Sequence, residues 1–65
     1  MNHNLESILD EIKCRYPVVE CSYYHDLEID KDVVYLSHAD IYSADYLLGQ
    51  LIKSGLLEEC IVCIN

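Results

Sequence analysis

The stretch that decides the fold is VECSYYHDLEID, residues 19–30. Its side chains alternate between two characters. One set is mostly apolar and falls on the odd positions, Val19, Cys21, Tyr23, His25, Leu27 and Ile29. The other set is mostly polar or acidic: Glu20, Ser22, Tyr24, Asp26, Glu28 and Asp30. Successive side chains of a strand point to opposite faces, so this period of two predicts a strand with an apolar face and an acidic face.

The residues after this stretch predict a hairpin. Asp30, Lys31 and Asp32 are turn-prone and include no glycine, which favours a loop of about three residues or more. A second strand then follows at Val33–Leu36. An alternative is that the first strand breaks near His25 and Asp26, which would leave Leu27–Ile29 in the loop.

The segment before the strand has the period of a helix. Apolar side chains recur at helical spacing, at Leu5, Ile8, Leu9, Ile12 and Tyr16. Asn4 can cap the start, and Pro17 forces the residue before it out of helical geometry. We therefore expect a helix over Leu5–Arg15.

A second helix is predicted after the hairpin. Ser37 and Asp40 can form a capping box at its start, although Ser43 is an equally good starting point. An apolar stripe follows, at Ile41, Ala44, Leu47, Leu48, Leu51 and Ile52. The helix should end at Ser54 and Gly55, and Cys60–Ile64 should form a short strand.

The predicted fold class is α+β, with the order helix, strand, strand, helix, strand. At 65 residues the chain has room for one domain, residues 1–65, because chains of this size bury only about 60% of their unfolded surface. We expect a three-stranded antiparallel sheet of order 2-1-3, with the first strand central and two helices covering one face. In the alternative arrangement the helices lie on opposite faces.

The charge of the chain restricts its partners. Twelve acidic and four basic residues give a formal net charge of −8, which repels nucleic acid and anionic membranes and attracts a basic partner. No apolar run approaches the roughly 18 residues of a membrane span, and the N-terminal segment lacks a basic region typical of a signal peptide. We expect a cytoplasmic protein with reduced thiols.

The residues that could carry chemistry are better explained as structural. Cys60 and Cys63 on a strand would point to opposite faces about 10 Å apart, so we predict no metal site and no cofactor. Cys21 could lie across from either of them and form a disulfide on oxidation. Ser37, His38 and Asp40 are too close in sequence to converge on one substrate atom. The sequence predicts a binding protein and no enzyme.

Two surfaces are candidates for the binding site. The first is the acidic face with its turn, formed by Glu20, Tyr24, Asp26, Glu28, Asp30 and Asp32. Alternate strand residues lie about 6.5–7 Å apart, which approximates the spacing of phosphates along a nucleic-acid strand. The second is the outer side of the second helix, with Tyr42, Asp45 and Tyr46. For the first surface, the alternative is an acidic strand face that is simply exposed to solvent. For the second, it is that the tyrosines pack on the first helix.

In size, acidity and element order the chain resembles the small phage-encoded anti-CRISPR proteins, particularly acidic inhibitors of type I Cascade complexes that act as DNA mimics. The resemblance implies binding to a basic DNA-recognising subunit, such as the Cas8-type large subunit, in the cytoplasm of an infected bacterium. It implies blocked DNA recognition without direct binding to nucleic acid. It aligns no motif and so assigns no site residues.

Two other functions remain open. If both helices cover one sheet face, an apolar side of Val33–Leu36 and of Cys60–Ile64 stays uncovered, which is typical of a homodimer or an assembly module. The protein would then be a dimer, whereas the inhibitor can be a monomer. A regulator that binds metal through the four cysteines is the third alternative.

Overall fold

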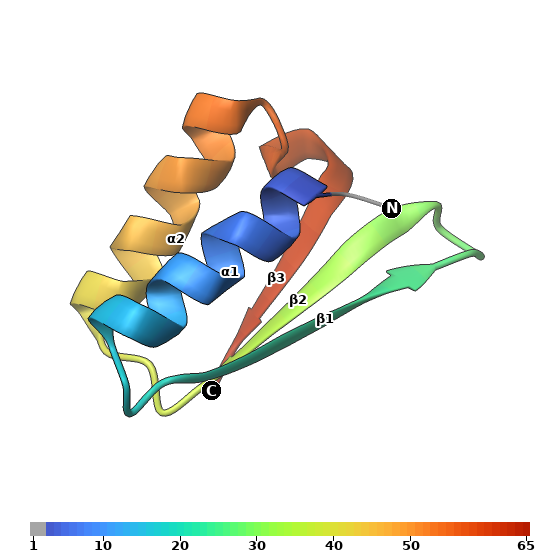
Figure 1. The fold of residues 1–65 in the computed structure, drawn as a ribbon. Helices are drawn as coiled ribbons and strands as arrows, with labels where there is room; N and C mark the ends of the chain where they lie inside the picture. Colours follow the sequence, from blue (N-terminus) through green and yellow to red (C-terminus); the bar gives the residue numbers. More distant parts are fainter. Residues whose placement is uncertain (1–2) are drawn as a thin grey trace.

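The fold has two helices and a three-stranded sheet, in a computed structural model that describes residues 3–65 (Figure 1). The elements follow the expected order. They are α1 (His3–Arg15), β1 (Glu20–Asp26), β2 (Lys31–Ser37), α2 (Ile41–Ser54), the single-turn 3-10 helix η1 (Leu57–Glu59) and β3 (Cys60–Ile64). The α+β class predicted from the sequence is confirmed.

The predicted sheet topology is wrong. The strand order is β1-β2-β3, with β2 in the centre. β1 and β2 form the expected antiparallel hairpin, but β2 and β3 are parallel, so the sheet is mixed. A parallel pair needs a crossover connection, and α2 provides it.

The side chains of β2 explain why this strand is in the centre of the sheet. Val33, Val34 and Leu36 are all buried, although neighbouring residues of a strand point to opposite faces. A strand that is apolar on both sides is typical of the middle of a sheet, whereas the alternation of β1 suits an edge. The lack of alternation in Val33–Leu36 was therefore the stronger signal for the central strand.

The first strand is shorter than the alternation predicted. β1 ends at Asp26, and residues 27–30 form the turn of the hairpin. Leu27 is 86% exposed and Ile29 is 45% exposed, so neither belongs to an apolar sheet face. The alternative in which the strand breaks near Asp26 is confirmed.

Both helices cover the same face of the sheet, as expected (Figure 1). The core between the two layers contains Leu5, Ile8, Leu9 and Ile12 of α1, Val34 and Leu36 of β2, and Leu47 and Leu51 of α2. Val19 and Leu56 complete it from the connecting segments. The alternative with helices on opposite faces is wrong.

The start of α2 differs from the expected capping box. Ser37 pairs with Glu20 in the sheet, so it is too far upstream to cap the helix. Asp40 is the N-cap, because its carboxylate accepts from Ser43 N at 2.8 Å while Asp40 N donates to Ser43 Oγ at 3.1 Å. The predicted end is confirmed, since Gly55 follows Ser54 with a φ of 74°.

The buried side of α2 is narrower than the predicted stripe. Leu47 and Leu51 are fully buried, whereas Ile41 and Ile52 are 70% and 62% exposed. A single sheet face and one neighbouring helix cover only part of the circumference of α2. Within residues 3–65, no helix is long and apolar enough to cross a membrane.

Candidate functional site

The turn of the hairpin is held by side chains of its own. Asp26 Oδ1 accepts from the backbone N–H of Glu28 at 2.9 Å, and Asp30 adopts a left-handed φ of 53°. Aspartate tolerates that conformation better than most residues do. The turn therefore holds Glu28 and Asp30 in exposed positions at the end of the sheet.

A second segment joins the turn because β3 is parallel to β2. The register pairs Asp32 with Cys60, which brings η1 next to the start of β2. Lys31 Nζ donates to the backbone carbonyl of Glu58 at 2.6 Å, and this hydrogen bond links the start of β2 to η1. Glu58 and Glu59 are both exposed there.

This region, residues 26–32 and 58–59, is called the hairpin end below. It contains half of the twelve acidic residues of the chain and a single basic residue, Lys31. The acidic members are Asp26, Glu28, Asp30, Asp32, Glu58 and Glu59. The negative charge of the protein is thus concentrated where β1 and β2 meet.

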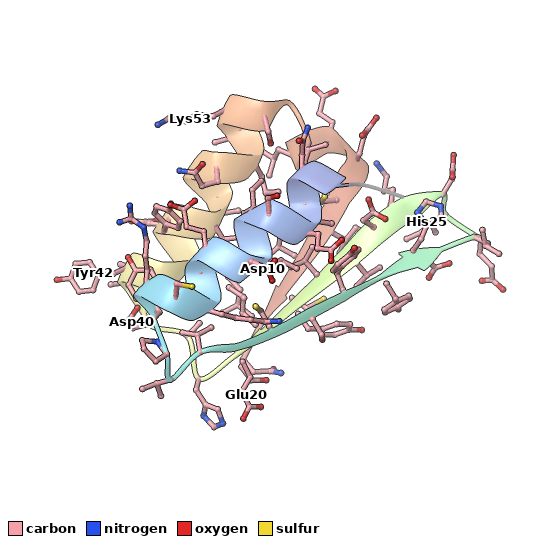
Figure 2. The ribbon with its side chains drawn as sticks, in the orientation of Figure 1. Asp10, Glu20, His25, Asp40, Tyr42 and Lys53 are labelled. Atoms are coloured by element: carbon pink, nitrogen blue, oxygen red, sulfur yellow. The ribbon has the colours of Figure 1, made fainter. Side chains whose placement is uncertain are left out.

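His25 bridges two carboxylates of the hairpin end. Its Nδ1 lies 3.0 Å from Asp32 Oδ1, and its Nε2 lies 3.1 Å from Asp30 Oδ1. These hydrogen bonds, first with Asp32 and then with Asp30, raise the pKa of His25 above its usual value. In Figure 2 the imidazole is seen at the hairpin, at the far right of the sheet.

The predicted acidic row is only partly realised. Glu20, Tyr24 and Asp26 lie on one face of β1, with Glu20 at the end of the strand opposite the hairpin (Figure 2). Asp32 is on the other sheet face, where it contacts His25 and is only 14% exposed. The acids at the turn form a cluster on two segments, so the regular phosphate-like spacing ends at Asp26.

Glu58 and Glu59 were missed by the sequence analysis. The two adjacent acids directly before Cys60 were the available signal. In the predicted antiparallel sheet of order 2-1-3 the starts of the second and last strands lie at the same end, but the first strand separates them. The parallel pairing places them together.

The residues of the other candidate surface, on α2, differ in exposure, because some face solvent and one packs on α1. Tyr42 is 72% exposed and points away from the sheet (Figure 2), and Asp45 is exposed beside it. Tyr46 instead packs on α1, with its ring 6.2 Å from that of Tyr16 and 4.7 Å from the guanidinium carbon of Arg15. A hydrogen bond with Glu11 raises the pKa of Tyr46. For Tyr46 the alternative of packing on the first helix is confirmed.

The cysteines do not form a common site. Cys21 is on β1 and Cys60 and Cys63 are on β3, so the central strand β2 separates Cys21 from both of its candidate disulfide partners. Burial raises the pKa values of the Cys21 and Cys60 thiols, and Cys21 Sγ lies 3.6 Å from the carbonyl oxygen of Leu9. Among residues 3–65 no group of His, Cys, Asp and Glu is arranged to hold a metal ion.

The sheet face away from the helices is the second uncovered surface of the protein. The side chains in its centre, called the open face below, are Ser22, Tyr24, Val33, Tyr35, Ile61 and Cys63. None of them is charged at neutral pH. Tyr24 and Tyr35 stack, with ring centroids 6.0 Å apart and planes 19° from parallel.

The fold and these surfaces define a small α+β protein with a mixed sheet covered on one face, an acidic end and an uncharged open face. No protein-family model matches the chain, and searches of curated proteins and of solved structures found no match.

Proposed function

We propose that this protein is an inhibitor that binds the positively charged surface of a nucleic-acid-binding protein in place of the nucleic acid. The observation that carries the proposal is the hairpin end, where six acidic residues accompany one lysine. Lysines and arginines that bind phosphates supply much of the affinity of such a surface for nucleic acid. Carboxylates held at the hairpin end can occupy those groups instead.

The geometry of the hairpin end suits such a competitor. Hydrogen bonds to Asp26 and His25 fix the turn, so the carboxylates of Asp26 and Asp30 lose little conformational freedom on binding. The net charge of −8 would also speed the encounter with a basic partner. Direct binding to nucleic acid is opposed by the same charge.

The resemblance in size, charge and element order to acidic anti-CRISPR proteins suggests a particular partner. It is the DNA-recognising large subunit of a type I CRISPR effector complex, whose target binding would be blocked. Such an inhibitor would act in the cytoplasm, where the four thiols stay reduced.

The test is competition with target DNA for a purified type I effector complex. The wild-type protein is expected to displace the DNA, and a Glu28→Lys, Glu59→Lys double variant should need at least about tenfold more protein. These two positions are exposed, and Asp30 is left intact because its carboxylate contacts His25. The dependence of the affinity on salt should also become weaker in this variant.

The matched control changes the net charge by the same amount elsewhere. Asp10→Lys with Asp45→Lys alters two exposed acids on the helices, outside the hairpin end and away from the uncovered sheet face, and should keep affinity within about threefold of the wild type. Equal losses in both double variants would show that only net charge matters. Failure of the wild-type protein to displace the DNA would refute this choice of partner.

A further inference from the structure

We infer that the open face is the apolar centre of the same interface, and that the partner surface combines aromatic or apolar side chains with lysines and arginines. The inference rests on the proposed function, because it adds the open face to the contact that the hairpin end makes with the basic partner. It specifies the kind of basic surface that the protein fits.

The open face has the exposure of an interface centre. Tyr24, Tyr35 and Ile61 are 49%, 38% and 40% exposed, although they are large apolar or aromatic side chains. Val33 is only 5% exposed. Within residues 3–65 both helices lie on the opposite face of the sheet (Figure 1). The side chains around Val33 therefore make a continuous apolar surface, with Tyr24 directly across from it on β1.

The charges around this surface select the occupant. Asp26 lies on the same face as Tyr24 and leads into the hairpin end, and Glu20 lies on that face at the other end of β1. Lys31, which pairs with Asp26, also lies on this face, but its ammonium donates to the backbone carbonyl of Glu58. A second copy of the chain would bring the same acidic border against this one. A partner with a basic border instead matches it, and protein interfaces commonly have an apolar centre and a polar rim.

Nucleic-acid-binding surfaces offer this combination. Proteins that bind unpaired nucleotides place lysines and arginines along the phosphates and stack the bases on aromatic side chains. The stacked rings of Tyr24 and Tyr35 lie beside the carboxylate-bearing end of β1. They can occupy the aromatic part of such a site while the hairpin end occupies its basic part.

The test compares two dye-labelled peptides of equal length and charge, one of repeated Lys-Lys-Trp and one of repeated Lys-Lys-Ser. The wild-type protein should bind the tryptophan peptide about tenfold more tightly by fluorescence anisotropy. Because the chain contains no tryptophan, a blue shift of tryptophan emission reports burial of the peptide rings alone.

Variants assign the preference to the open face. Tyr24→Ser with Tyr35→Ser should reduce it to about twofold or less, whereas Tyr24→Phe with Tyr35→Phe should retain it. Ile61→Ser, on β3, is a second variant in case the double serine variant does not fold. Glu28→Lys with Glu59→Lys should weaken binding of both peptides.

Three results would overturn the inference, and they are distinguishable. Equal affinity of the wild-type protein for the two peptides would exclude the open face and leave the acidic contact intact. Peptide binding that does not depend on Glu28 and Glu59 would refute the proposed function as well. A dimer of the free protein in sedimentation equilibrium, dissociated by the tyrosine-to-serine changes, would assign the open face to a second copy.

Discussion

His25 is the residue whose chemistry is most constrained by its surroundings. Both ring nitrogens lie within hydrogen-bond distance of a carboxylate oxygen. A neutral imidazole has one N–H and can donate to only one of them, whereas the imidazolium can donate to both. The charged form of His25 therefore stabilises the turn between Asp26 and Lys31.

This contact predicts the pH dependence of the hairpin. Because the pKa of His25 is raised in the folded protein, its contribution to stability is present below the ordinary pKa of about 6.5. It is lost as the pH rises through the raised value. The urea midpoint of the wild type relative to that of a His25→Gln variant should therefore decrease as the pH rises from the ordinary pKa of histidine through the raised pKa of His25.

The same titration followed by NMR separates the two carboxylates. Asp32→Asn should lower the pKa of His25 more than Asp30→Asn does, since Asp32 is the larger cause of the shift and is far less exposed than Asp30. A larger effect of Asp30→Asn would contradict this geometry.

Individual side chains were predictable only where the local pattern fixed them. The alternation placed Tyr24 and Asp26 on one face of β1 correctly. Glu28 and Asp30 were predicted on that face as well, but β1 ends at Asp26 and both residues lie in the turn, where Asp30 is left-handed. Asp32, expected in the turn, is a residue of β2. Its contact with His25 depends on the closed hairpin.

At the scale of elements, replacing Gly49 inside α2 and Gly55 at its C-terminal end by alanine should change the free energy of unfolding in opposite directions. A Cβ at either position would meet no atom within 4 Å, so only backbone conformation matters. Gly49→Ala should stabilise the protein by about 0.5–1 kcal/mol, because glycine is a poor residue inside a helix. Gly55→Ala should destabilise it by about 1 kcal/mol, because its φ of 74° suits glycine.

Urea unfolding of the two variants measures the difference directly. The matched environments make each variant the control for the other, since neither alanine fills or creates a cavity. Destabilisation by Gly49→Ala would mean that α2 is packed more closely than the structure shows.

The elements themselves were mostly predictable, since each depends on a period within its own residues. Leu5, Ile8, Leu9 and Ile12 are buried as their spacing indicated, and β3 has the predicted limits. The order of the strands was not predicted correctly, because it depends on which side of the hairpin α2 returns to. The apolar run Val33–Leu36 is the part of the sequence that indicates a central strand, because its residues do not alternate between apolar and polar.

At the scale of the whole molecule, self-repulsion should make stability depend on salt. The principal extents are 30, 22 and 17 Å, and the screening length falls from about 30 Å at 0.01 M salt to about 8 Å at 0.15 M. At low salt the acids of the two helices, the hairpin and η1 therefore repel one another across the protein. Raising the salt over this range should stabilise it by about 1 kcal/mol, or about 4–8 °C in Tm.

Thermal unfolding in sodium chloride and in choline chloride provides the measurement and its control. Equal increases in the two salts would indicate screening, because choline cannot occupy a specific cation site as sodium can. A decrease in Tm on adding either salt would contradict net self-repulsion. Direct binding to the basic partner proposed above should weaken over the same range, so stability and binding should respond in opposite directions.

The parallel placement of β3 also has a kinetic consequence. The hairpin pairs residues that are between 5 and 17 positions apart in the chain, whereas every pair between β2 and β3 spans 28 positions. Closing the longer loop costs more entropy than closing the hairpin. The β1–β2 hairpin should therefore form first during folding, and β3 should pair with β2 last. Because Lys31 contacts Glu58, that last step also completes the acidic hairpin end.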